Sequence, residues 1–268
     1  MHHPYVPHPE FEGRSQNGEY ADMMIEHDYR VGQVLQAIEA AGIAENTLII
    51  YASDNGPDRV LFPTVGDTGP FRGYLGDVHE GAVRTPMMMK WPGKIEAGRE
   101  TNDIFAINDI YTTIANIVNT DVPNDRAIDG VDQSCLLFNN CTTPPREGVL
   151  FFHEETLAAA KWRQFKFYFR GEGTMQEERS YNDLWLPQAY NIMQDPKEYA
   201  DILLQNLWLL SPALRQLVPF YVSVRQYGII QPGDSQPTQG DIEIPFVESS
   251  QLNKMFEQMM EQRKGKTN

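Results

Sequence analysis

An aspartate and an asparagine stand next to each other in a short polar segment, and their side-chain oxygens could bind a metal ion. The segment is Ser53-Asp54-Asn55-Gly56, and it follows directly on the apolar run at residues 47–52. Carboxylate and carboxamide oxygens are ligands of hard divalent cations, so Asp54 and Asn55 are candidate ligands of Ca²⁺, with Mg²⁺ as the alternative ion. The competing interpretation is a plain Asx turn, because Asp-Asn-Gly is also a common turn sequence.

The elements before this segment predict that it lies at the edge of a sheet. Apolar residues recur with helical spacing over residues 20–38, and Gly42 then provides a helix-ending signal. The run at residues 47–52 is short and almost wholly apolar, which predicts a parallel strand covered on both faces. A helix followed by a buried strand indicates an α/β fold, in which ligands bind at the carboxyl ends of strands. This position favours a binding site at Asp54 and Asn55.

Further elements follow in the same pattern. Residues 57–82 are rich in glycine and proline and predict a long functional loop, and residues 83–90 predict a second short strand. Residues 104–118 predict an amphipathic helix. Its apolar stripe consists of Ile107, Ile110, Tyr111, Ile114, Ile117 and Val118.

The second half of the chain predicts a smaller unit of strands and helices. The polar, proline-containing stretch at residues 121–146 is a candidate domain boundary. Residues 148–152 and 165–169 predict strands, and the second alternates aromatic and polar side chains as a half-exposed strand would. Residues 196–215 predict a helix, and residues 247–263 predict a terminal helix with Leu252, Met255, Phe256 and Met259 on one face.

Composition limits the partners that this chain can bind. The formal net charge of −15 and the isoelectric point near 4.8 disfavour nucleic acids and anionic membranes, because the field of the chain repels phosphates. A small anionic substrate would need local cations or a metal. No apolar run is long enough to span a membrane, and nothing in the sequence indicates the compartment. Cys135 and Cys141 could form a disulfide or remain as two thiols.

The loop after Asp54 and Asn55 carries Gly-Pro-Phe-Arg-Gly at residues 69–73 and Glu-Gly-Ala-Val-Arg-Thr-Pro at residues 80–86. It resembles a signature of the type I sulfatase (arylsulfatase) family. The family pattern is Gly-Pro-Leu/Phe-Arg-Gly-x-Lys-Gly-x-x-x-Glu-Gly-Gly-x-Arg-x-Pro, preceded by Ser-Asp-Asn-Gly. Weaker similarity extends over residues 1–230 and includes Met1-His2, Tyr20-Ala21-Asp22-Met23 and Ile128-Asp129-Gly130-Val131-Asp132.

The resemblance implies a fold and a domain organisation. The fold would be α/β, an incomplete alkaline-phosphatase-like sulfatase fold with a mixed sheet flanked by helices, plus a smaller C-terminal α+β subdomain. Residues 1–135 would be the C-terminal part of the catalytic domain, residues 136–235 the smaller subdomain, and residues 236–268 a tail with the terminal helix.

The resemblance also implies roles for individual residues in the hydrolysis of sulfate esters. Asp54 and Asn55 would be metal ligands. His2 would contact the sulfate and assist proton transfer, with His3 taking its place if the register shifts by one residue. Arg72 is a further candidate for substrate binding, whereas Glu80 with Arg84 is expected to brace the loop. The substrate would be a small sulfate ester or a sulfated glycan.

The chain departs from the family pattern in three ways. It contains no Cys/Ser-x-Pro-x-Arg motif, from which sulfatases make their formylglycine nucleophile, and Cys141-Thr142-Thr143-Pro144-Pro145-Arg146 has its proline one place late. The Asp-Asp metal pair of the family is also absent. Leu75 occupies the place of the sulfate-binding lysine. We therefore expect formylglycine only in a missing N-terminal segment, which would be a partner of this chain, and we expect the chain alone to be inactive.

Two other functions remain open at this stage. A phosphatase or phosphonate hydrolase of the same superfamily would use a Thr or Ser nucleophile, and that nucleophile would lie in the missing segment. A non-catalytic binding module, or pseudoenzyme, would keep the shape of the metal turn without the reaction, and Leu75 favours this reading.

Overall fold

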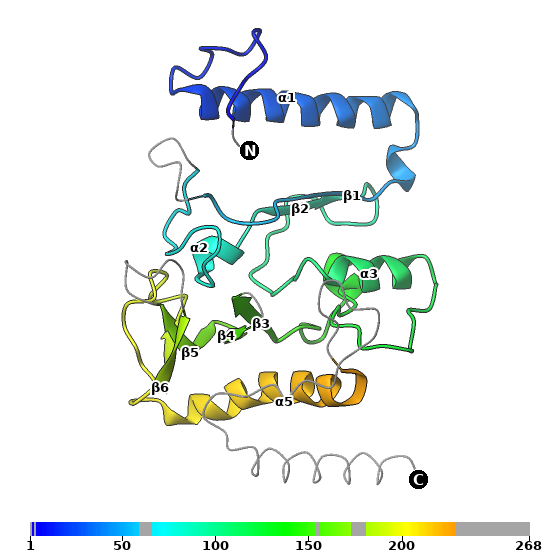
Figure 1. The fold of residues 1–268 in the computed structure, drawn as a ribbon. Coiled ribbons are helices and arrows are strands. Elements are labelled where there is room, and N and C mark those ends of the chain that lie inside the picture. Colours follow the sequence, from blue (N-terminus) through cyan, green and yellow to red (C-terminus); the bar gives the residue numbers. More distant parts are fainter. Residues whose placement is uncertain (1, 3, 59–65, 154–155, 173–180, 229–268) are drawn as a thin grey trace. The chain divides into compact units, whose positions relative to one another are not determined.

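The computed structural model describes residues 2, 4–58, 66–153, 156–172 and 181–228. The chain divides into two compact units, residues 1–100 and residues 101–268, and each is described by itself (Figure 1). The expected tail at residues 236–268, with its terminal helix, lies outside the described residues. The expected domain boundary after residue 135 stays a prediction.

The first unit begins with the long helix that the sequence predicts. Helix α1 spans Glu19–Ala40 and is followed by Gly42, which adopts a positive φ of 67°. The amide of Gly42 donates to the carbonyl of Glu39 at 3.0 Å, so the glycine ends the helix in the usual left-handed conformation. Asp22 is the buried residue of this helix, whereas Tyr29 and Val34 are 49% and 58% exposed.

The strand before the candidate site is shorter than predicted, and its partner runs in the opposite direction. After the 3₁₀ turn η1 (Ala44–Asn46), β1 spans Ile49–Ala52 and pairs antiparallel with β2, Met87–Lys90. Within the described residues this is the one pairing that β1 makes, so the parallel strand covered on both faces is not observed there. An apolar run predicts a strand but does not determine which segment pairs with it. Here the chain returns from the loop and lies antiparallel.

The predicted strand at residues 83–90 is also shortened. Its first residue, Val83, belongs instead to the one-turn helix α2, Glu80–Val83. The strand itself therefore begins only at Met87. The rest of the described part of the predicted loop at residues 57–82 is irregular, as its glycine and proline content indicates.

In the second unit, α3 spans Asp109–Ile117 and α4 spans Ser134–Leu137. The predicted amphipathic helix therefore forms over a shorter range than residues 104–118. The buried residues of α3 are Asp109, Thr112, Thr113 and Ala115. The polar side of this helix is thus the buried side.

A four-stranded antiparallel sheet forms the body of the second unit. Its strands are β3 (Gly148–His153), β4 (Thr156–Trp162), β5 (Phe165–Glu172) and β6 (Tyr181–Asn191), in the order β3-β4-β5-β6. Helix α5, Leu210–Tyr227, packs on this sheet through β3 and β4 (Figure 1). The side chains of the core between sheet and helix are Leu157, Ala160, Phe167, Phe169, Ala189, Leu203, Leu209, Ala213, Leu217 and Tyr221.

Strand β5 is buried on both faces, so the prediction of a half-exposed strand was wrong. Lys166, Phe167 and Tyr168 are all buried. Since successive side chains of a strand point to opposite faces, both faces of β5 are covered here. The ammonium nitrogen of Lys166 lies 4.5 Å from the centroid of the Phe151 ring and 5.6 Å from that of Tyr168. Aromatic faces attract a cation, and this stabilises a lysine where alternation alone predicts an exposed one.

The helix predicted at residues 196–215 begins later than expected. A 3₁₀ turn, η3 (Leu207–Leu209), precedes α5, which continues to Tyr227. Glu198 has a positive φ of 56°, and the carboxylate of Asp195 accepts hydrogen bonds from the amides of Tyr199 and Ala200 at 2.7 and 2.8 Å. These local bonds compete with a helix in the preceding segment. None of the helices in the described ranges is both long and apolar enough to cross a bilayer.

Candidate functional site

The turn after β1 leaves two side-chain oxygens available to a cation. The Oδ1 atom of Asp54 accepts a hydrogen bond from the amide of Asn55 at 2.9 Å, and Nδ2 of Asn55 donates to the carbonyl of Gly56 at 2.8 Å. The Oδ2 atom of Asp54 and the Oδ1 atom of Asn55 have no hydrogen-bond partner among the described residues. Asp54 is exposed and Asn55 half-buried. Both bonds join adjacent residues, so neither is the bond to the amide two residues on that defines an Asx turn, and two oxygens stay unengaged.

Backbone hydrogen bonds join this turn to the loop that follows it. The amide of Ser53 donates to the carbonyl of Pro86 at 3.2 Å, and the amide of Gly56 donates to the carbonyl of Ala82 at 2.8 Å. The amide of Leu75 donates to the carbonyl of Pro57 at 2.9 Å. Since these bonds involve main-chain atoms, the position of the turn is set by the path of the loop.

Glycines permit this close packing. A β-carbon on Gly56 would lie 2.1 Å from the carbonyl oxygen of Gly81, and one on Gly81 would lie 2.6 Å from that of Arg72. Gly73 has a positive φ of 99°, and a β-carbon added to it would lie 2.6 Å from the β-carbon of His79. Each glycine therefore allows one backbone segment to approach another.

A buried glutamate and an arginine support the loop from within. Glu80 is 1% exposed, and its Oε2 lies 3.5 Å from Nη1 of Arg84. The guanidinium of Arg84 also lies 4.6 Å from the centroid of the Phe71 ring. This agrees with the expected bracing role of Glu80 and Arg84.

The candidate substrate-binding residue Arg72 lies within the same loop. Its side chain is half-buried, and its carbonyl accepts a hydrogen bond from the amide of Gly81 at 2.6 Å. Leu75, three residues further along the loop, is also half-buried. The carboxylate of Asp77 accepts a hydrogen bond from the amide of Tyr74 at 2.8 Å and so fixes the turn that contains Leu75. A role of Arg72 toward substrate stays a prediction.

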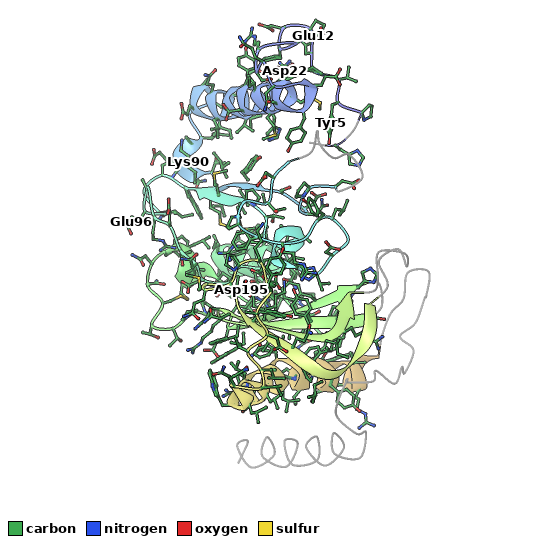
Figure 2. The ribbon with its side chains drawn as sticks, turned by 90° about the vertical axis from the view of Figure 1, so that its left-hand side faces the viewer. Tyr5, Glu12, Asp22, Lys90, Glu96 and Asp195 are labelled. Atoms are coloured by element: carbon green, nitrogen blue, oxygen red, sulfur yellow. A yellow bond between two sulfur atoms is a disulfide. The ribbon has the colours of Figure 1, made fainter. Side chains whose placement is uncertain are left out.

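His2 is exposed at the start of a segment that α1 holds in place; His3 lies outside the described residues. Asp22 lies on α1, where Figure 2 labels it. Its carboxylate accepts hydrogen bonds from the amides of Gly13 and Ser15 at 2.8 and 2.7 Å. Hydrogen bonds from Ser15 and then from Gly13 lower the pKa of Asp22. The sequence offered one sign of this role, since Asp22 is a carboxylate among helical apolar positions. Contact between His2 and a sulfate stays a prediction.

Asp54 and Asn55 provide the right kind of ligand for Ca²⁺ but too few ligands. A Ca²⁺ ion takes six to eight oxygen ligands, and carboxylate and carboxamide oxygens are typical of them. In the part of the chain that the structure describes, no group of three or more His, Cys, Asp or Glu side chains is placed to hold an ion. The remaining ligands would have to come from elsewhere.

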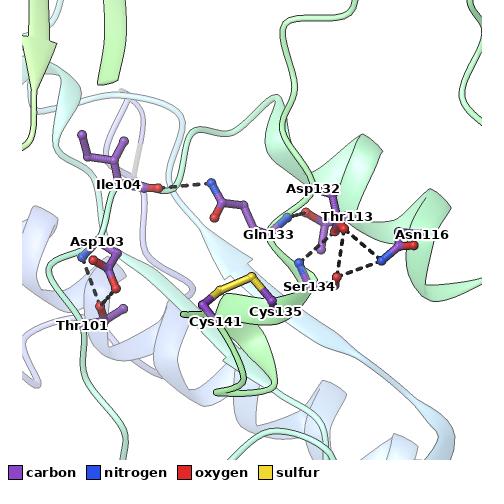
Figure 3. Close-up of a disulfide and its surroundings, with 10 residues drawn as sticks. All are labelled: Thr101, Asp103, Ile104, Thr113, Asn116, Asp132, Gln133, Ser134, Cys135 and Cys141. Carbon is purple, nitrogen blue, oxygen red and sulfur yellow. Dashed lines mark hydrogen bonds between the residues drawn. A yellow bond between two sulfur atoms is a disulfide. The ribbon is translucent and has the colours of Figure 1, made fainter. Parts of the chain in front are cut away.

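In the second unit, Cys135 and Cys141 form a disulfide, with their Cα atoms 4.9 Å apart (Figure 3). The alternative of two free thiols is therefore not observed. Arg146, the last residue of the sequence that partly resembles a formylglycine motif, pairs instead with the buried carboxylate of Asp109. A linker role for residues 141–146 stays a prediction.

Comparison with known proteins finds similarity to sulfatases. The sulfatase family model matches residues 1–120. The steryl-sulfatase of Rattus norvegicus is 34% identical over 168 residues, which are 61% of this chain and 29% of that protein. The N-acetylgalactosamine-6-sulfatase of Canis lupus familiaris is 34% identical over 170 residues, which are 63% of this chain and 32% of that protein.

A solved structure extends the similarity beyond the family model. The PsFucS1 sulfatase from Pseudoalteromonas sp. superimposes with a TM-score of 0.78 at 28% sequence identity, covering 85% of this chain and 47% of that chain. The chain thus spans about a third of the length of these two curated relatives and about half of the length of the solved sulfatase. Residues 1–120 of the chain belong to the sulfatase family.

Proposed function

We propose that the complete protein hydrolyses sulfate esters and that this chain supplies part of its metal and sulfate site. The observation that carries the proposal is the pair of unengaged oxygens on Asp54 and Asn55, at the carboxyl end of β1 and joined by backbone bonds to the sulfatase-like loop. Membership of the sulfatase family supports the reaction class.

In this proposal Asp54 and Asn55 hold Ca²⁺, or alternatively Mg²⁺, together with ligands outside this chain. When bound, the ion would offset negative charge on the sulfate oxygens. His2 would contact the sulfate and transfer a proton to or from the reacting group. Arg72 would add a cation near the substrate. The nucleophile, a formylglycine, would also lie outside this chain.

The substrate class follows from the relatives and from the charge of the chain. The names of the relatives include a steryl-sulfatase and an N-acetylgalactosamine-6-sulfatase, so a small sulfate ester and a sulfated glycan are both candidates. The net charge of −15 repels an anionic substrate at a distance. Binding would therefore depend on the ion and on nearby cations such as Arg72.

The chain alone should not turn over substrate, because it lacks the nucleophile and part of the metal ligands. The test is an assay of the purified 268-residue chain with 4-nitrophenyl sulfate in the presence of Ca²⁺. Hydrolysis that disappears in Asp54→Ala would show that the chain has a complete site of its own, against the proposal.

A completed protein tests the positive half of the proposal. In a form that includes the remaining sulfatase residues, Asp54→Ala should lower kcat/KM for the sulfate ester by at least about 100-fold, since metal stabilisation supplies several kcal/mol. Asp121→Ala, which removes another exposed aspartate, is the matched control. Faster hydrolysis of 4-nitrophenyl phosphate than of the sulfate would favour the phosphatase alternative, and Ca²⁺ binding without hydrolysis of either would favour a binding module.

A further inference from the structure

Helix α3 buries its polar side in a hydrogen-bonded network. Thr113 is 2% exposed, and its hydroxyl accepts a hydrogen bond from the amide of Gln133 at 2.9 Å. The Nδ2 atom of Asn116 lies 2.9 Å from Oδ2 of Asp132 and 2.8 Å from Oγ of Ser134 (Figure 3). Thr113 is buried and Asn116 is exposed, and both side chains bond the segment that carries residues 131–134.

The apolar side of α3 is exposed. Four side chains at helical spacing form what we call the α3 stripe. Their exposed fractions are 61% for Ile107, 52% for Tyr111, 41% for Ile114 and 61% for Val118. An apolar stripe on a helix normally faces a core, and a contiguous exposed one marks an interaction surface. A helix that buries its polar side and exposes its apolar side is suited to burial on both sides in a larger domain.

We propose that the α3 stripe is the interface for the part of the sulfatase fold that this chain does not contain. The PsFucS1 match covers 85% of this chain but only 47% of that sulfatase, so a comparable amount of polypeptide is available to cover the stripe. The family match ends at residue 120, directly after α3, whereas the partners of the polar side lie at residues 131–134. Helix α3 therefore lies within the matched part of the chain, and its apolar side is opposite the side that bonds residues 131–134.

A second copy of this chain is a less suitable occupant. A nine-residue helix is only about 14 Å long, and a stable interface buries roughly 800 Å² on each partner. The α3 stripe provides a small fraction of that area. It is sized for one contact among many in a domain interior and not for a dimer that depends on it alone.

Co-purification tests the occupant directly. The DNA upstream of the Met1 codon is sequenced, and the sulfatase-like segment expected there is expressed as a separate tagged polypeptide together with this chain. The wild-type chain should co-purify with it, and Ile114→Lys should reduce the recovered chain by at least about 10-fold. Leu204→Lys is the matched control, because Leu204 is also a branched aliphatic side chain of this unit and is 69% exposed. This variant should co-purify like the wild-type chain. Equal recovery of Ile114→Lys, or the absence of a sulfatase-like segment upstream, would overturn the proposal.

Measurements on the chain alone separate the other occupants. Ile114→Lys should lower the fluorescence of an added apolar dye while its thermal midpoint stays equal to that of Leu204→Lys. A midpoint several degrees lower would mean that the chain covers the stripe itself, and a stable dimer that Ile114→Lys dissociates would identify a second copy. Either result contradicts the proposal. None of these readouts uses activity, so failure of the proposed function would leave the outcome unchanged.

Discussion

The amide of Gly56 donates a hydrogen bond to the carbonyl of Ala82 at 2.8 Å, and the neighbouring Gly81 carbonyl fills the space of a β-carbon at residue 56. The candidate metal turn and the sulfatase-like loop are therefore in backbone contact without intervening side chains. Any change that separates these two segments also moves Asn55 relative to the loop.

A side chain at residue 56 should disrupt this contact. In Gly56→Ala the new β-carbon would lie 2.1 Å from a backbone oxygen, so one of the two segments must move. We expect a loss of about 1–3 kcal/mol in the free energy of unfolding, measured by urea denaturation. Gly32→Ala in the middle of α1 is the control, because a β-carbon there meets no atom within 4 Å and alanine favours the helix by about 1 kcal/mol. Equal unfolding curves for the two variants would contradict the packing argument.

The sequence predicted the local elements at the site better than their partners. The apolar run before Asp54 does form a strand, and Gly42 ends the preceding helix as predicted. The direction of pairing was wrong, because strand direction depends on where Met87–Lys90 returns and not on the run itself. Which residues hold the loop in contact was also not predictable, since backbone contacts such as Gly56 to Gly81 leave no periodic pattern.

Burial was the least predictable property. Periodicity identified the apolar stripe of α3, but the contacts that bury the opposite side come from residues about 20 positions away, such as Gln133 on Thr113. The ammonium group of the buried Lys166 lies over the Phe151 ring, which belongs to another strand. Pairing of Cys135 with Cys141 depends on the turn between them bringing the two Cα atoms together. All three outcomes depend on tertiary contacts that a linear pattern does not contain.

Restoring the family lysine should increase activity in a completed protein. Leu75 lacks the charge-assisted hydrogen bond that a lysine would offer a sulfate, a contribution of about 1.5–3 kcal/mol. We therefore expect Leu75→Lys to raise kcat/KM for a sulfate ester by about 10- to 150-fold, with Leu75→Met as the uncharged control. If Leu75→Lys has no effect while Arg72→Met lowers kcat/KM to a similar extent, Arg72 already supplies the missing cation.

The second unit should lose stability in acid through Asp109. Burial alone would raise the pKa of this carboxyl group, but hydrogen bonds from Arg146, Val131, Gln133 and Ala106 outweigh it and lower the pKa. Since the unfolded group titrates near about 3.9 and the folded group below that, its contribution is complete above the unfolded pKa. That contribution is lost as the pH falls through the folded pKa.

Asp109→Asn tests this linkage. The substitution leaves the guanidinium of Arg146 without its buried counter-charge, so we expect a loss of about 3–5 kcal/mol at pH 7 and a weaker dependence of stability on pH below about 4. Urea unfolding at pH 7, 4 and 3 measures both. Asp125→Asn breaks the exposed pair with Arg126 and should change the unfolding curve little. An unchanged acid transition in Asp109→Asn would assign that transition to other carboxylates.

The disulfide between Cys135 and Cys141 should stabilise the second unit only modestly, because it closes a short loop. For a sequence separation of 6, the loss of chain entropy in the unfolded state corresponds to about 2 kcal/mol. The amide of Asn140 also donates to the carbonyl of Cys135 at 3.0 Å, so the folded turn should keep its shape without the disulfide.

We therefore expect reduction of the disulfide to lower the urea midpoint. The double variant Cys135→Ser/Cys141→Ser should unfold like the reduced protein and should not respond to reductant. A wild-type midpoint that is equal with and without reductant, in protein whose mass confirms the disulfide before treatment, would show that the bond contributes nothing to stability.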